Sequence, residues 1–123
     1  KIIQYVNQNE GQFANTTEYA PYLHELGHKY YEDCIKAVEK RQNIGYNEAK
    51  KKINLQIVEY IDNLTKKGKL LKDVLSEYAR IGYNHQQYTE VIAESFSVRK
   101  DNIIAQELLQ IIDGGIKNDE ALD

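Results

Sequence analysis

The chain has 123 residues, of which 41% are hydrophobic and 28% charged, which suits one globular domain around a single core. Its formal net charge of −3 offers no basic excess for binding nucleic acid or anionic lipid. No apolar run approaches the roughly 18 residues of a membrane helix, so we expect neither nucleic acid nor a membrane as a partner.

The chain starts at Lys1 and contains no methionine, so we expect it to be a fragment of a longer protein, whose other segments could be partners. No signal-peptide pattern is present at its start. The single cysteine, Cys34, cannot form an internal disulfide, and we expect it to be a small buried hydrophobe. The lone cysteine fits a reducing compartment, so we favour the cytoplasm as the location, with secretion as the alternative.

The first residues have the composition of a short β-hairpin. Residues 1–6 are rich in β-branched and aromatic side chains, as strands are, and residues 7–11 are turn formers. Residues 12–14 would be the return strand or an extended lead-in to the next element.

Apolar periodicity in the rest of the chain predicts helices joined by short breaks. Thr17 is expected to cap the first helix, Asn47 the second, Asn84 the fourth and either Asp101 or Asn102 the last. On the first helix we expect an apolar stripe made by Leu23, Leu26, Tyr30, Ala37 and Val38. The predicted helices cover about 18–42, 48–66, 70–80, 85–97 and 103–112, with residues 81–83 as a connection and 113–115 as the closing turn. The expected fold class is therefore mainly α, or α+β if the hairpin is counted.

The first predicted helix carries the pattern H-E-x-x-H at His24-Glu25-Leu26-Gly27-His28. Residues four apart lie on the same face of a helix, so the two imidazoles can bind one Zn²⁺. Glu25 is close enough to that face to act as general base towards a water that the metal activates. Gly27 would allow another backbone to approach closely between the two histidines.

A catalytic zinc needs a third protein ligand. The metzincin pattern would continue along the same helix with a glycine and a third histidine, but Tyr31 and Cys34 occupy those positions. The best candidates are Glu90 and Glu94, which share one face of the fourth helix among apolar residues. One carboxylate could bind the metal while the other accepts a hydrogen bond from a ligating histidine. His85 is a rival third ligand.

Three segments together resemble the gluzincin metallopeptidases whose third ligand lies in an E-x-x-A-E-x-F helix. The resemblance is greatest to the family of the anthrax lethal factor catalytic domain and to the metallopeptidase-like domains of phage and prophage head-morphogenesis proteins. The segments are T-x-x-x-P-x-x-H-E-L-G-H at 17–28, S-E-Y-A at 76–79 and E-x-x-A-E-x-F at 90–96. The resemblance implies one zincin-like domain over residues 1–123, with His24, His28 and Glu90 as zinc ligands, Glu25 as the general base and Glu94 supporting a ligand.

These families also place a tyrosine upstream of the third ligand, where its hydroxyl can stabilise the oxyanion. Tyr78 matches the local S-x-Y-A pattern, and Tyr83 matches better by its distance from Glu90 along the chain. Both tyrosines stay open as candidates.

The expected function is a zinc-dependent endopeptidase acting on a peptide or protein, with the predicted hairpin pairing with the extended substrate. One alternative is a zinc-stabilised module with weak or no activity and a structural or assembly role in a phage or prophage protein. Another is a helical interaction domain without a metal.

Overall fold

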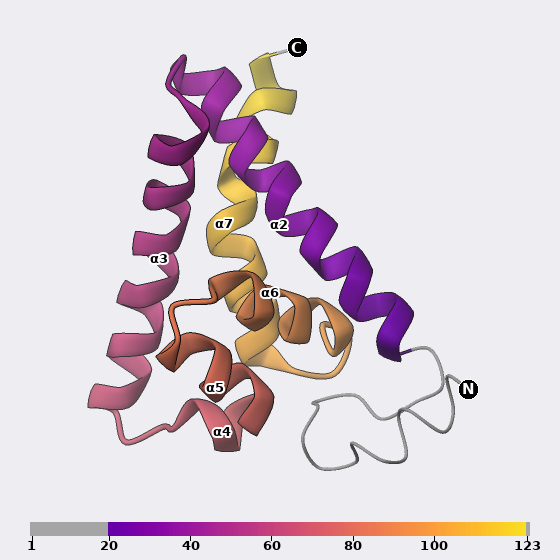
Figure 1. Ribbon diagram of the computed structural model, residues 1–123, viewed down its shortest axis with the longest axis vertical. Coiled ribbons are helices and arrows are strands. Elements are labelled where there is room, and N and C mark those ends of the chain that lie inside the picture. The colour runs from indigo at the N-terminus through magenta and orange to yellow at the C-terminus, as the bar shows by residue number, and fades with distance from the viewer. Residues whose placement is uncertain (1–19, 123) are drawn as a thin grey trace.

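The structure is a computed structural model that describes residues 20–122, with side chains described for 21–113. The described residues contain helices and no strand. The helices are α2 (Ala20–Gln42), α3 (Tyr46–Lys66), α4 (Leu71–Val74), α5 (Glu77–Asn84), α6 (Tyr88–Ser97) and α7 (Ile103–Leu122) (Figure 1). The expected mainly helical class is confirmed, whereas the predicted hairpin in residues 1–14 and the predicted cap Thr17 lie outside the described residues.

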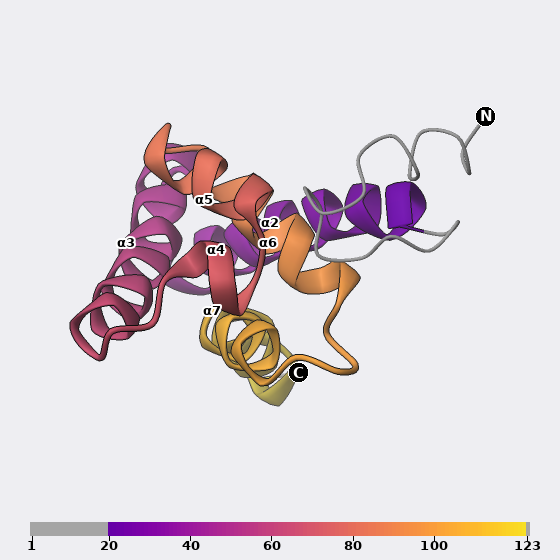
Figure 2. The ribbon, with the colours of Figure 1, turned by 90° about the horizontal axis from the view of Figure 1, so that it is seen from below.

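The three longest helices form a frame around a shorter central one. In Figure 1, α2 and α3 diverge from the turn that joins them, and α7 lies between them. The short helix α6 contacts α2, α5 and α7, and α4 and α5 close the open end of the frame (Figures 1 and 2). None of the described helices is long and apolar enough to cross a membrane.

The core is built from aliphatic faces that the periodicity of the sequence predicts for α3, α6 and α7. On α3 the periodicity predicts an apolar side made by Ile53, Ile57, Tyr60, Ile61 and Leu64, and this side is confirmed, since four of the five are buried and Tyr60 packs against the core. The buried core residues of these three helices are Ala49, Ile53, Ile57, Ile61, Leu64, Val91, Ile92, Ala93, Ile104, Ala105, Leu108, Leu109 and Ile112.

The predicted stripe of α2 is confirmed only at Val38, which is buried, and at Tyr30, which packs against the core. The residues of α2 that are buried in the core are Tyr31, Cys34, Ile35 and Val38, of which only Val38 was expected in the stripe. The reason is that α2 contacts α3, α6 and α7, so its buried face is decided by three neighbours rather than by one apolar side. Cys34 is fully buried, as expected.

The predicted third helix, residues 70–80, is wrong as a single element. It is divided by Leu75 and Ser76, which leave helical geometry, and Ser76 is fully extended at φ −169° and ψ 162°. The Ser76 hydroxyl accepts a hydrogen bond from Ala79 N at 3.1 Å and so caps α5. Residues 81–83, predicted as a connection, lie inside α5.

The end of α5 also explains why the predicted cap at Asn84 is wrong. Asn84 lies in the last turn of α5, and Gln86 follows in the left-handed region at φ 61°. Gln87 N then donates to Gly82 O at 2.8 Å, which is the bond of a Schellman motif. Helix ends of this type usually carry glycine or asparagine at the left-handed residue, so a glutamine there gave no signal.

The other boundaries agree in part with the prediction. α2, α3 and α6 end where expected, and Asn102 caps α7, its Oδ1 accepting from Ala105 N at 3.0 Å. Asn47 lies inside α3, because the extended residue Gly45 is the cap. The predicted closing turn at 113–115 is wrong, since α7 continues to Leu122.

Candidate metal centre

The histidine pair occupies the second and third turns of α2. His24 and His28 lie on one face, with their rings edge to face and their centroids 4.9 Å apart. Their side chains are 15% and 26% exposed, so both rings are held within the structure while solvent still reaches them. The predicted spacing thus produces a pair of neighbouring imidazoles.

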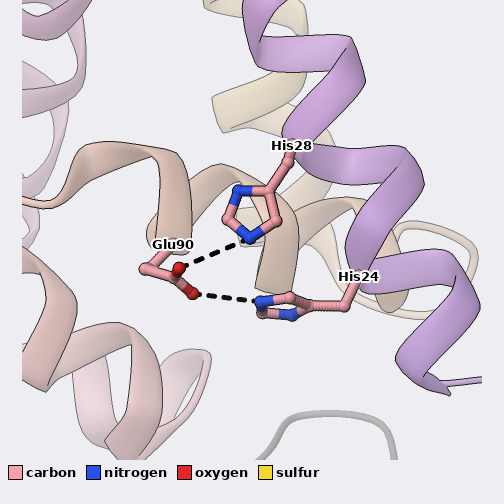
Figure 3. Close-up of side chains that lie close together, drawn as sticks. All are labelled: His24, His28 and Glu90. Carbon is pink, nitrogen blue, oxygen red and sulfur yellow. Dashed lines mark hydrogen bonds and ion pairs between the residues drawn. The ribbon is translucent and has the colours of Figure 1, made fainter.

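Helix α6 brings one carboxylate to both rings. Glu90 Oε2 lies 3.0 Å from His24 Nε2, and Glu90 Oε1 lies 3.4 Å from His28 Nε2. Figure 3 shows Glu90 pointing from α6 between the two histidines of α2. One ligand atom from each of the three residues lies within 4.8 Å of the others, which makes them a group able to hold a metal ion.

Glu94, one turn further along α6, has a different position. Its side chain is 2% exposed, and its Oε2 lies 3.2 Å from the other ring nitrogen of His24, Nδ1. Its Oε1 accepts a hydrogen bond from Ser76 Oγ at 2.6 Å. Burial lowers the pKa of His24, but the hydrogen bonds with Glu94 and Glu90 outweigh it, so the pKa is raised overall.

Two glycines allow the helices to approach this closely. A Cβ on Gly27 would lie 2.5 Å from Ala93 Cα, so α2 and α6 touch backbone to backbone at the motif. The close approach that the sequence suggests between the histidines is therefore present. A Cβ on Gly82 would lie 2.8 Å from Glu90 Cβ, so α5 packs directly against the side-chain stem of Glu90.

Sequence reasoning missed two partners of the cluster. Thr89 Oγ1 lies 2.6 Å from His28 Nδ1, and Ser76 links the cap of α5 to Glu94. Thr89 directly precedes Glu90, but a threonine in the first turn of a helix carries no specific signal. Ser76 belongs to the S-E-Y-A segment at 76–79, in which the sequence pattern indicated a candidate role only for Tyr78.

The structure separates the two candidate tyrosines. The ring centroid of Tyr78 lies 5.5 Å from that of His24, whereas Tyr83 packs 5.7 Å from Tyr88. Tyr83 also lines a cavity between α3, α4 and α5. Of the two tyrosines, only Tyr78 is placed beside the histidines.

The remaining candidates lie outside the cluster. Glu25 follows His24 on α2 and is exposed. His85 is exposed at the end of α5, where its Nδ1 lies 2.8 Å from Ile81 O. It is not part of the group formed by His24, His28 and Glu90.

The donor set fits a zinc ion. Both Nε2 atoms face Glu90, whereas both Nδ1 atoms are held by other groups, Glu94 for His24 and Thr89 for His28. Histidine ligands of zinc characteristically donate their second ring N–H to a carboxylate or another acceptor. Two nitrogens and one carboxylate form a set typical of catalytic zinc, which keeps one position open.

Comparisons with protein-family models, with curated proteins and with solved structures find no match to this chain. The candidate metal centre is therefore supported by the geometry of its side chains alone.

Proposed function

We propose that the chain is a zinc-dependent endopeptidase of the gluzincin type, with His24, His28 and Glu90 as the zinc ligands. One observation supports this above the others. The three side chains converge through both Nε2 atoms and one carboxylate, and each Nδ1 has its own hydrogen-bond partner. In a chance cluster of polar residues, there would be no reason for the Nε2 atoms of both rings to face the same carboxylate while both Nδ1 atoms bind other groups.

The proposed substrate is a peptide or protein, and the chain's own groups divide the work. Zinc, when bound, would polarise the scissile carbonyl and make water a better nucleophile. Glu25, exposed beside His24, accepts the proton of the attacking water and later donates it to the leaving amine. Tyr78, whose ring lies against His24, is the candidate donor to the oxygen of the scissile carbonyl as negative charge develops there.

The first test replaces the general base. We expect Glu25→Gln to bind zinc with wild-type stoichiometry and to lose peptide cleavage by about 100-fold or more. Metal analysis and a cleavage assay on a mixed peptide library measure the two quantities. Cleavage at the wild-type rate by the zinc-loaded variant would show that Glu25 is not the base.

A matched pair of variants separates the two carboxylates of α6. Glu90→Ala should lose zinc, whereas Glu94→Ala should retain it with weakened affinity, because Glu94 lies against Nδ1 of His24, the ring nitrogen that does not face Glu90. If Glu90→Ala retained zinc and Glu94→Ala lost it, Glu94 would be the metal ligand and Glu90 the residue that supports His24.

A second candidate function is a zinc-stabilised module without catalysis, used in assembly of a larger particle. The observation in its favour is that the cluster joins α2 to the central helix α6, where a metal would brace the fold. A single-turnover assay distinguishes the two functions, since a purely structural zinc would stabilise the chain and leave every peptide intact.

A further inference from the structure

A second feature lies directly beside the candidate metal centre. It is a cavity of about 300 Å³ between α2, α3 and the start of α6. This volume is at the lower end of the range usual for ligand sites. The walls used below are Tyr31 on α2, Lys50 and Asn54 on α3, and Thr89 and Glu90 on α6.

The cavity shares a wall with the metal centre. Glu90 faces both histidines and also lines the cavity, and Thr89 lines it while contacting His28 Nδ1. Tyr31 lies three residues after His28, on the next turn of α2. A peptide with its scissile bond at the metal centre would thus have a neighbouring side chain within reach of this cavity.

The chemistry of the cavity favours a negatively charged group. Lys50 is half-buried in its wall, and no carboxylate of the described residues lies within ion-pair distance of its ammonium. Asn54 Oδ1 accepts a hydrogen bond from the Tyr31 hydroxyl, which leaves the amide N–H groups of Asn54 available as donors. The amides of Gln86 and Gln87 complete a wall rich in donors.

Among the described residues that line the cavity, Glu90 is the only one with a carboxylate. It is placed between two imidazoles, where it would be a ligand of the proposed metal ion rather than a free carboxylate facing the cavity.

We propose that this cavity is a specificity subsite for an acidic side chain next to the scissile bond, with Lys50 as its ion-pair partner. The inference rests on the proposed peptidase function and adds a substrate class to it. Lys50 determines which side chain is accepted and takes no part in bond cleavage.

The test measures binding as well as turnover. The probes are three short peptide hydroxamates that differ only in carrying a glutamate, glutamine or lysine side chain beside the metal-binding group. Their affinities for the zinc-loaded Glu25→Gln chain are measured by calorimetry. We expect the glutamate probe to bind about tenfold tighter than the lysine probe, as expected for a partly desolvated charge pair.

Charge reversal provides the decisive comparison. Lys50→Glu should invert the preference, so that the lysine probe binds best. Lys51→Glu makes the same change of charge at the neighbouring exposed position, which does not line the cavity, and should leave the preference unchanged. Thermal unfolding of both variants checks that the fold is retained.

The outcomes separate this inference from the function on which it rests. Equal affinity for the three probes, or a preference that survives Lys50→Glu, would overturn the subsite, even if the wild-type chain cleaves peptides. Loss of the glutamate preference in Lys50→Glu would support the subsite. If the wild-type chain showed that preference but cleaved no peptide, the absence of cleavage would overturn the peptidase function alone. Failure to bind zinc and every probe would overturn both.

Discussion

At the scale of single residues, each imidazole of the candidate centre has both ring nitrogens engaged. The Nε2 atoms of His24 and His28 face Glu90, and their Nδ1 atoms face Glu94 and Thr89. The contact at Nδ1 orients Nε2, because a ring held at Nδ1 has little freedom to rotate. The residues that hold Nδ1 are thus as much part of the site as the ligands.

We expect Thr89→Val to weaken zinc binding by about 10–100-fold with little change in stability. Valine keeps the shape of threonine but cannot accept the N–H of His28 Nδ1, so the ring is no longer held in position. Competition with a chelator of known affinity measures the effect.

The control for this change is Thr65→Val on α3. Thr65 Oγ1 donates to Ile61 O at 3.0 Å, far along the chain from the metal cluster, so zinc affinity should stay at the wild-type value. Equal zinc affinities for the two variants would show that Thr89 does not position His28.

At the scale of helices, the site depends on how closely α2 approaches α6. Gly27 sits between the two histidines, and a Cβ there would meet Ala93 Cα at 2.5 Å. Real Cβ atoms do not come this close to backbone, so the two helices can only meet in this way because residue 27 has no side chain. The same approach brings Glu90 within reach of both rings.

We expect Gly27→Ala to lower the free energy of unfolding and to weaken zinc binding together. Overpacking costs about 1–3 kcal/mol and more where backbone must move, which outweighs the gain of about 1 kcal/mol from removing glycine from a helix. Urea denaturation and zinc titration measure the two effects.

Gly45→Ala is the matched control, because a Cβ there has nothing within 4 Å. Its zinc affinity should stay at the wild-type value, and its free energy of unfolding should fall by no more than about 1 kcal/mol, because alanine is a poorer N-cap of α3 than glycine. If Gly27→Ala behaved like this control, the close contact between α2 and α6 would not exist in solution.

At the scale of the whole molecule, the cluster connects the outer frame to its centre. His24 and His28 belong to the long helix α2, whereas Glu90 belongs to the short helix α6 (Figure 3). Glu94 lies one turn further along α6. A ligand held by both helices binds the folded chain and not the unfolded one. Its binding energy therefore adds to the stability of the fold.

Zinc should consequently raise the free energy of unfolding by about 2.7 kcal/mol at a free concentration of 100 Kd. Chemical denaturation with buffered zinc measures the increase, and excess chelator should reverse it. Glu90→Ala should abolish the increase. An unchanged stability of the wild-type chain across the zinc series would contradict the proposed centre.

Cys34 offers an independent report on the whole fold. It is fully buried, and burial, followed by the negative charge of Asp113, raises the pKa of its thiol to about 12. Since only the thiolate reacts, iodoacetamide at pH 8 should label the folded chain very slowly and the urea-unfolded chain rapidly. The labelling should follow loss of helical circular dichroism. Rapid labelling without urea would show that α2 is not packed as described.

Parts of the fold and of the site could be predicted because they depend on short stretches of chain. The ends of α2, α3 and α6 follow from local periodicity and breaks, and Asn102 is a recognisable cap. The divided third helix could not be predicted, because Ser76 leaves helical geometry while capping α5 and bonding to Glu94 from another helix. The left-handed Gln86 likewise has no local signal.

The amino-acid sequence is enough to predict that two imidazoles share a face of α2 and that two carboxylates share a face of α6, since a spacing of four residues places side chains together within one helix. Three features could be seen only in the folded chain: Glu90 faces both rings while Glu94 faces one, Tyr78 rather than Tyr83 adjoins His24, and Lys50 lines a cavity beside the site. These are relations between helices, and they depend on how closely and at what angle the helices cross. That crossing follows from packing between residues far apart in the chain, which no local pattern records.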